Sequence, residues 1–260
     1  MRKSNDGLTI FKRISMLSIV ICSKNKELCD QLVANINQTI GIPFELEIIS
    51  GAESITQAYE TGLKKSSGEL CLFLHEDVIF HTQDWGKTLL GHFNSDSTIG
   101  LIGVAGAKIH TFIPSAWWDC SENEKVIRIL QHKPGGQTED QNQGFEAGKL
   151  VEVAVIDGVF MALRKEVGAH FDQTLKGFHG YDLDISLAVQ ENGYKVAVIQ
   201  DVVLEHFSLG NLQLGWLTAL LQVHRKYKHI LPLAKGDAES SLLQEIRNLV
   251  QLFKHYIKLH

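Results

Sequence analysis

Apolar and polar residues alternate in blocks along the first part of the chain. A short apolar run at 17–22 is bounded by polar residues, which is typical of a buried strand. After it, Leu28, Leu32, Ile36 and Ile40 recur every four residues, which predicts an amphipathic helix. Residues 17–40 are therefore expected to form a first β-α unit.

A second unit repeats this plan. Residues 46–49 indicate a strand, and residues 54–68 a helix that opens on a capping-box pattern. The most apolar strand follows at 70–74 and ends abruptly in polar residues. Alternating strands and helices of this length predict a doubly wound, mostly parallel α/β sheet, which binds ligands at the carboxyl ends of its strands. Ser23 and Asp77, each just past a strand, should face one crevice.

The rest of the chain is less regular. We expect a strand at 99–104 and a long functional loop at 106–149. Two strands around a tight corner at Asp157-Gly158 should follow. The remaining predicted elements are strands at 151–156, 159–163 and 195–199, an apolar strand-like run at 202–204, and helices at 182–192, 211–231 and 239–258.

These elements divide the chain into three parts. Residues 1–15 are a flexible leader, 16–210 form the α/β domain, and 211–260 form a C-terminal helical extension. Apolar residues on one face of the last helix predict that the extension packs on the domain or on a partner, and a homodimer through these helices is one such arrangement. That face contains Leu242, Ile246, Leu249, Val250, Phe253 and Ile257.

Composition narrows the function classes. A hydrophobic content of 44% suffices for a buried core, and a net charge of −5 with a pI near 6.2 argues against a nucleic-acid-binding protein. No apolar run approaches the roughly 20 residues needed to span a bilayer. The four cysteines form no CxxC pair, which favours a reducing compartment. We therefore expect a cytoplasmic protein, with peripheral contact with a membrane left open.

Several acidic residues and histidines follow the predicted strands. Glu76 and Asp77 end an apolar strand, where a divalent cation would neutralise them, although a solvated loop would look the same. Asp182 and Asp184 open a helix, so one of them could simply be an N-cap, and the other catalytic. His206 lies just beyond an apolar run, as packed and surface histidines also do.

The adjacent Trp117 and Trp118 have two readings. They could stack on a sugar, or they could anchor a loop.

The order of these features resembles family 2-like glycosyltransferases of the GT-A fold, in particular the subgroup related to streptomycin-biosynthesis glycosyltransferases. The resemblance covers about residues 16–210. The matching segments are 18–25, 58–62, 73–78, 104–106, 157–162, 177–184 and 205–208.

This resemblance implies a role for several residues. Residues 75–77 take the place of the DxD motif, so that Asp77 binds the metal that bridges the donor diphosphate, with His75 in place of the first Asp. Asp182 matches the catalytic base, with Tyr181 in place of the preceding Glu. His206 matches a downstream histidine that completes the metal site. Ser50-Gly51 replaces acidic residues that are common in the family's base pocket.

We accordingly expect a metal-dependent, inverting glycosyltransferase that uses Mn²⁺ or Mg²⁺, a nucleotide-sugar donor and a hydroxyl acceptor. The expected acceptor-binding residues are Trp117, Trp118 and Tyr181. The expected nucleotide-sugar-binding residues are Ser23, Asn25, Glu53, His75, Glu76, Asp157 and Gly158.

Three alternatives remain. The first is a catalytically inactive module that binds a nucleotide sugar or glycan with the same fold. The second is a nucleotidyltransferase, which would require a glycine-rich phosphate loop that residues 23–27 do not provide. The third, a purely structural protein, explains only the C-terminal helices.

Overall fold

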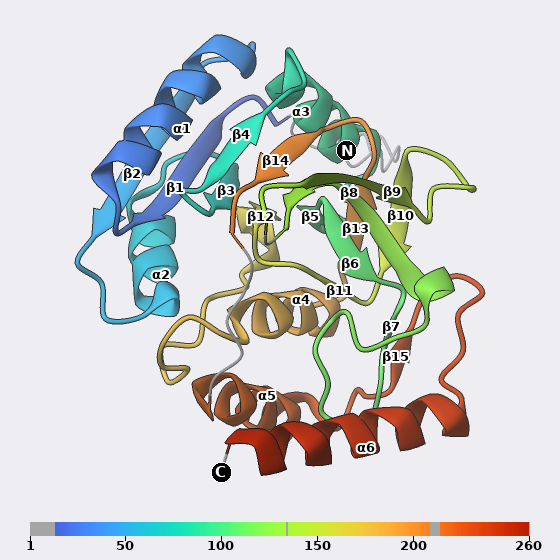
Figure 1. The fold of residues 1–260 in the computed structure, drawn as a ribbon. Helices are drawn as coiled ribbons and strands as arrows, with labels where there is room; N and C mark the ends of the chain where they lie inside the picture. The colour runs from blue at the N-terminus through green and yellow to red at the C-terminus, as the bar shows by residue number, and fades with distance from the viewer. Residues whose placement is uncertain (1–13, 134, 209–213, 260) are drawn as a thin grey trace, which may run out of the picture.

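The computed structural model of the protein describes residues 14–133, 135–208 and 214–259. Its centre is a seven-stranded sheet with the strand order β10-β13-β5-β12-β3-β1-β2 (Figure 1). Apolar clusters on both faces of this sheet include residues of the helices, which confirms the predicted α/β class. Most of the expected leader at 1–15 lies outside the described residues, as do residues 211–213.

The first half of the sheet has the parallel arrangement that the hydrophobic pattern predicts. β1 (Leu17–Ser23) pairs in parallel with β2 (Phe44–Ser50) on one side and with β3 (Leu70–Leu74) on the other. The connecting helices are α1 (Lys26–Thr39) and α2 (Ile55–Lys65). Because the three strands are parallel, the segments that follow β1 and β3 meet at the same edge of the sheet.

The core lies on both faces of this sheet, because successive side chains of a strand point to opposite sides. Ile19 of β1 belongs to a cluster that includes residues of α1 and of α3 (Trp85–Ser95). Its neighbour Val20 belongs to the opposite cluster, together with Tyr59 of α2. All three side chains are fully buried.

The second half of the sheet is mixed, so the prediction of a mostly parallel sheet was only partly right. β12 (Phe160–Arg164) runs antiparallel between β3 and β5 (Ile99–Gly103). β13 (Lys195–Ile199) pairs in parallel with β5, and β10 (Leu150–Val153) runs antiparallel to β13. A 3-10 turn, η2 (Lys165–Val167), follows β12.

A second, six-stranded sheet occupies much of the segment at 106–149 that was expected to be a loop, and this expectation was wrong. The chain runs from β10 into this sheet through β11 and returns to the first sheet in β12, so the corner at Asp157 joins strands of different sheets. The strands of the second sheet are β4 (Val78–Phe80), β6 (Ala105–Ala107), β8 (Lys125–His132), β9 (Thr138–Gln143), β11 (Val155–Ile156) and β14 (Leu204–His206).

Three smaller elements complete this region. β7 (Ile109–His110) and β15 (Leu233–Ala234) pair with each other in antiparallel orientation. The short 3-10 helix η1 (Glu122–Glu124) leads into β8.

The last helices are α4 (Tyr181–Glu191), α5 (Leu214–Tyr227) and α6 (Leu242–Leu259). Leu183 of α4 and Leu217 of α5 share a third apolar cluster, so α5 packs on the α/β domain. α6 lies beside α5 at the outer edge of the molecule (Figure 1). None of the helices in the described part of the chain has the length and the apolar run that crossing a membrane requires.

Candidate active site

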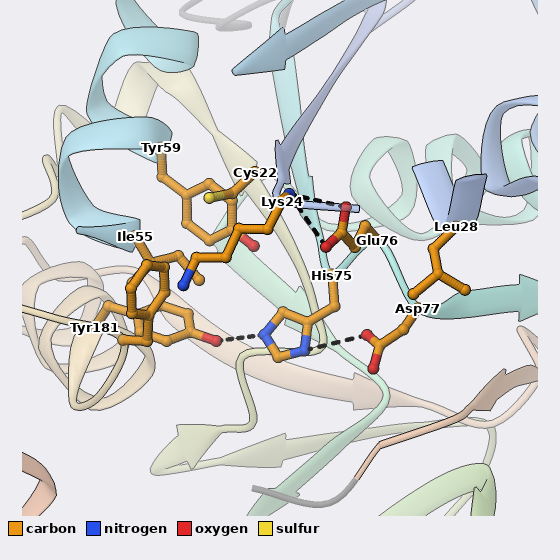
Figure 2. Close-up of a pocket in the computed structure, with 10 residues that line it drawn as sticks. Cys22, Lys24, Leu28, Ile55, Tyr59, His75, Glu76, Asp77 and Tyr181 are labelled. Atoms are coloured by element: carbon orange, nitrogen blue, oxygen red, sulfur yellow. Dashed lines mark hydrogen bonds and ion pairs between the residues drawn. The ribbon is translucent and has the colours of Figure 1, made fainter. Parts of the chain in front are cut away.

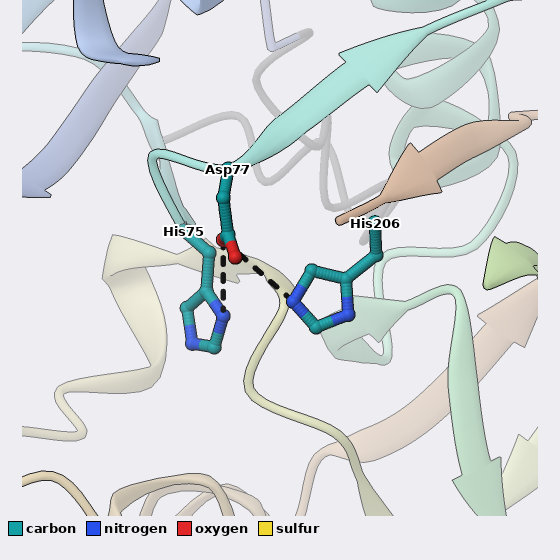
Figure 3. Close-up of side chains that lie close together, drawn as sticks. All are labelled: His75, Asp77 and His206. Atoms are coloured by element: carbon teal, nitrogen blue, oxygen red, sulfur yellow. Dashed lines mark ion pairs between the residues drawn. The ribbon is translucent and has the colours of Figure 1, made fainter. Parts of the chain in front are cut away.

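Three potential metal ligands meet at the carboxyl end of β3. Asp77 Oδ1 lies 4.0 Å from His75 Nδ1 and 3.6 Å from His206 Nε2. All three ligand atoms lie within 4.8 Å of one another, and the three side chains are partly or fully buried (Figure 3). His206 comes from the end of β14, far along the chain from β3, so the second sheet completes the cluster.

The orientation of His206 is fixed by Gln131 of β8. The Gln131 Nε2 group donates to the backbone carbonyls of His132, His206 and Ser208, at 3.0, 3.3 and 2.9 Å. These bonds orient the amide, so that its Oε1 accepts a hydrogen bond from His206 Nδ1 at 3.0 Å. Nε2, which faces Asp77, then carries the lone pair, and the Ser208 hydroxyl oxygen lies 3.4 Å from it. Burial and the nearby His75 lower the pKa of His206, which also favours the neutral imidazole that a metal requires.

His75 has a comparable partner on its other side. Its Nε2 lies 2.6 Å from the hydroxyl oxygen of Tyr181, at the start of α4 (Figure 2). When Nδ1 serves as a ligand, Nε2 carries the proton and donates it to that oxygen. Gly158 makes room for this contact, because a Cβ at that position would lie 2.2 Å from the Tyr181 oxygen.

The donor set suits a divalent transition metal. One carboxylate provides the oxygen ligand that Mg²⁺ and Mn²⁺ prefer, whereas two imidazoles shift the preference away from Mg²⁺. Both imidazoles are held by hydrogen bonds to their second ring nitrogens, which is the usual arrangement around protein-bound metals. The residues present therefore fit a cation of the Mn²⁺ type.

Asp157 lies in the corner between β11 and β12. Its Oδ1 accepts from the backbone N–H of Val159 at 2.8 Å, and its Oδ2 accepts from Trp117 Nε1 at 2.7 Å. Its charge acts on both His206 and Asp182, which places Asp157 near each of them. The hydrogen bond to Asp157 thus fixes the Trp117 ring, and its contact with a sugar stays a prediction.

Asp182 has the electrostatics of a general base. Burial, reinforced by the negative charge of Asp157, raises the pKa of Asp182 to about 7. One of its oxygens accepts from the backbone N–H of Leu183 at 2.9 Å. A carboxylate whose pKa lies near neutrality can accept a proton efficiently and release it again.

Asp184 is engaged differently. Its buried carboxylate accepts from Lys226 Nζ of α5 at 2.7 Å and from the backbone N–H of Asp172 at 3.2 Å. Burial raises the pKa of Asp184, and Lys226 opposes the shift. Asp184 therefore ties α4 to α5, in agreement with the supporting role expected for one of the two acids.

A cavity of about 220 Å³ opens beside the cluster (Figure 2). Lys24 reaches over it, and its Nζ lies 3.4 Å from the centre of the Phe178 ring. Lys24 and Phe178 were not predicted as site residues, because a lone lysine after a strand carries no motif. The lining residues are Cys22, Lys24, Leu28, Ile55, Tyr59, His75, Glu76, Asp77, Phe178 and Tyr181.

Two of the residues expected to bind the nucleotide sugar, Ser23 and Asn25, lie in different surroundings. Ser23 lines a neighbouring cavity of about 420 Å³ with Lys26, Ser50 and Gly51. The Asn25 side chain instead caps α1, accepting from the backbone N–H groups of residues 27 and 28.

Glu76 and Glu53 also have identifiable surroundings. Both carboxylate oxygens of Glu76 accept from the backbone N–H groups of Lys24 and Asn25, at 3.0 to 3.2 Å, so Glu76 fixes the turn after β1. Glu53 is exposed in the segment before α2, and its backbone N–H donates to Gln57 Oε1.

Trp118 packs on α5. Its ring stacks on Trp216 of α5, with 6.4 Å between the centroids, and meets the Trp117 ring edge-on. Trp118 thus anchors the loop to α5, as one reading of the pair expects. Trp117 contacts Asp157, and sugar stacking by either tryptophan stays a prediction.

A model described as "Glycosyltransferase like family" matches residues 18–217. The chain belongs to this family. A search of curated proteins gave no match.

Solved structures show the same fold. GalNAc-T7, solved with UDP, GalNAc and Mn²⁺, has a TM-score of 0.56 at 14% identity, covering 94% of this chain and 55% of that one. S. aureus TarS 1-349, solved with UDP-GlcNAc, has a TM-score of 0.52 at 10% identity, covering 94% of this chain and 73% of that one. The chain thus spans about half the length of the GalNAc-T7 chain. Family and fold are those of glycosyltransferases.

Proposed function

We propose that this protein is a metal-dependent, inverting glycosyltransferase that moves a sugar from a nucleotide-sugar donor to a hydroxyl acceptor. The observation that carries the proposal is the cluster of His75, Asp77 and His206 at the carboxyl end of β3. Asp157 lies close enough to act electrostatically on both His206 and Asp182, and so connects the metal ligands to a carboxylate with a pKa of about 7. Membership of the streptomycin-related subgroup remains a prediction.

Asp77, His75 and His206 would hold the cation, with Mn²⁺ favoured over Mg²⁺ by the two imidazoles. When bound, the cation supplies charge neutralisation for the departing nucleotide diphosphate. Lys24, above the cavity beside Asp77, is placed to add a second positive charge.

Asp182 would act as the base. The acceptor hydroxyl oxygen forms a bond to the anomeric carbon while the bond from that carbon to the diphosphate oxygen breaks. The hydroxyl proton passes to Asp182, and the electron pair leaves with the nucleoside diphosphate. A single displacement of this kind inverts the anomeric configuration. Asp157 and Trp117 would position the sugar or the acceptor beside Asp182.

The nucleoside is expected in the cavity lined by Ser23, Lys26, Ser50 and Gly51. Because GalNAc-T7 and TarS were solved with uridine nucleotides, UDP-sugars are the first donors to test. The residues that line this cavity include Ser23 and Ser50, whose hydroxyl groups can form hydrogen bonds with a nucleoside. None of the lining residues is acidic.

The decisive experiment is a thermal-shift screen of nucleotide sugars with and without Mn²⁺, followed by an assay of donor hydrolysis. Stabilisation follows affinity, reaching about 2.7 kcal/mol at a hundredfold excess of ligand over its Kd. We expect Mn²⁺-dependent stabilisation by at least one UDP-sugar, and its loss in Asp77→Asn.

Asp201→Asn is the matched control. Asp201 is also partly buried and paired with a histidine, His92, at 2.8 Å, but it lines neither cavity. Equal donor binding in Asp77→Asn and in the wild type would contradict the proposal. Mn²⁺-dependent binding with neither hydrolysis nor transfer would favour the inactive binding module.

A further inference from the structure

The apolar face of α6 points away from the domain. Phe253 is 62% exposed and Ile257 is 61% exposed, against less than 5% for most core residues. Amphipathic helices of globular proteins normally bury this face. The exposed apolar residues of α6 are Leu242, Leu243, Ile246, Leu249, Val250, Phe253, Tyr256 and Ile257, and we refer to them as the outer face.

The opposite, polar edge of α6 holds the helix to the domain. Glu245 accepts from the backbone N–H groups of Phe112 and Ile113 at 2.8 and 2.9 Å. The Asn248 side chain is buried and donates to Thr111 Oγ1 at 2.8 Å. These bonds fix the rotation of α6 about its axis. Because these hydrogen bonds hold the polar edge of α6 against the domain, the outer face is exposed to solvent.

An apolar groove extends the outer face toward α5. It has a volume of about 200 Å³ and lies where α5 and α6 pack together. Leu217 and Leu221 of α5 line it, together with Leu249, Leu252, Phe253 and Tyr256 of α6. The apolar surface is thus wider than one helix.

Positive charge follows one edge of the outer face. Arg247, Lys254 and Lys258 are exposed and recur at helical spacing, next to Val250 and Ile257. The single carboxylate in the α6 sequence, Glu245, is bonded inward. This local excess of positive charge contrasts with the net charge of −5 of the whole chain.

Two further acidic residues lie before the helix. Asp237 and Glu239 are exposed in the segment that leads into α6, so the positive charge gathers toward its C-terminal half.

We propose that α6 docks the protein on a membrane surface that contains anionic lipid, with the helix lying in the plane of the interface. A broad apolar face with large aliphatic and aromatic side chains, bordered by lysine and arginine, is the combination that such surfaces bind. A second copy fits less well, because two copies of α6 meeting face to face would place a helix with net positive charge on both sides of the contact.

The test is cosedimentation of the full chain with vesicles of phosphatidylcholine alone, and of phosphatidylcholine mixed with phosphatidylglycerol. We expect binding to the anionic vesicles and little to the neutral ones. One basic residue near an anionic surface contributes about fivefold in affinity, so Lys254→Gln with Lys258→Gln should weaken binding roughly 25-fold. Phe253→Ser should weaken it on the order of tenfold or more.

Matched controls lie on distant elements. Lys64→Gln with Lys87→Gln removes two exposed lysines from α2 and α3, and Ile48→Ser removes an exposed apolar side chain from β2. These variants should bind anionic vesicles as the wild type does.

Three outcomes would overturn the proposal. The first is no vesicle binding by the wild type, and the second is equal loss in the control and α6 variants. The third is a dimer, seen by sedimentation velocity, that Phe253→Ser dissociates and vesicles do not disrupt, which would assign the outer face to a second copy. Because no donor or Mn²⁺ is present, each outcome is independent of the transferase proposal.

Discussion

The Tyr181 hydroxyl oxygen lies 2.6 Å from His75 Nε2, which joins the first turn of α4 to the end of β3. In the sequence these residues belong to separate motifs, and Tyr181 was expected to contact the acceptor. The contact gives Tyr181 a second role, because its oxygen can accept the Nε2 proton of His75 when Nδ1, which faces Asp77, serves as a metal ligand. Where the resemblance implies a Glu, this chain thus has a side chain that would support the proposed metal site.

Tyr181→Phe should therefore weaken Mn²⁺ binding. Loss of a partner that orients a metal-bound histidine typically reduces metal affinity by about 10- to 100-fold. Isothermal titration with Mn²⁺ in the presence of UDP measures this effect. Tyr59→Phe is the control, since the buried Tyr59 hydroxyl donates to the Leu74 carbonyl and to no metal ligand. Equal Mn²⁺ affinities in both variants would remove Tyr181 from the metal site.

Gln131→Leu tests the other histidine. Without Gln131 Oε1, nothing fixes the proton of His206 on Nδ1, so Mn²⁺ affinity should again fall by about 10- to 100-fold. Gln141→Leu on the adjacent strand is the control, because the partly buried Gln141 side chain contacts only Glu139 among the bonds described. If both variants bind Mn²⁺ as the wild type does, Gln131 has only a structural role.

Much of the fold could be predicted because its first half has strong local patterns. The run at 70–74 is apolar at every position, so its strand and the crevice at its end follow from the sequence. β9, in contrast, contains only polar residues and is a strand because it pairs with β8. β6 has the sequence Ala-Gly-Ala and no detectable pattern. Such strands depend on neighbours that are distant in sequence.

Some residues of the candidate site could likewise be predicted from the sequence, and others could not. Residues at strand ends, such as Asp77 and His206, could be selected from the sequence because polar residues that follow apolar runs are conspicuous. Gln131 lies within a strand of ordinary composition, and its role depends on three carbonyls brought together by the fold. For α6, the sequence predicts an apolar face but not its direction, which Glu245 and Asn248 determine.

Trp117→Phe should affect the acceptor more than the donor. The substitution keeps an aromatic ring but removes the N–H that binds Asp157, and a hydrogen bond to a charged group contributes about 1.5 to 3 kcal/mol. We expect kcat/KM for the acceptor to fall by about tenfold or more, with donor stabilisation in thermal shift unchanged. Trp118→Phe, which alters a ring stacked on Trp216, should leave kcat/KM near the wild-type value. The reverse ranking would assign the acceptor contact to Trp118.

Asp182→Asn should remove turnover while leaving the donor site intact. The amide has nearly the same size but cannot accept the acceptor's proton, and loss of general-base help costs on the order of 10² to 10⁴ in rate. In the wild type, activity should rise with pH through about 7, as the carboxyl loses its proton. That acidic limb should be absent from the residual activity of Asp182→Asn. Donor affinity, measured by thermal shift with Mn²⁺, should persist.

Asp182→Asn, which should lower turnover, should also raise the stability of the fold. Folding raises the pKa of Asp182 from its ordinary 3.8 to about 7, so between these pH values the folded chain keeps a proton that the unfolded chain releases. Asp182 therefore destabilises the fold increasingly as pH rises through this window. Asp182→Asn should raise Tm above that of the wild type at about pH 8, and the difference should shrink toward about pH 4.

Asp184→Asn should instead lower Tm, because it breaks the buried ion pair with Lys226. Near-normal turnover in Asp182→Asn, together with a large loss in a folded Asp184→Asn protein, would transfer the role of base to Asp184.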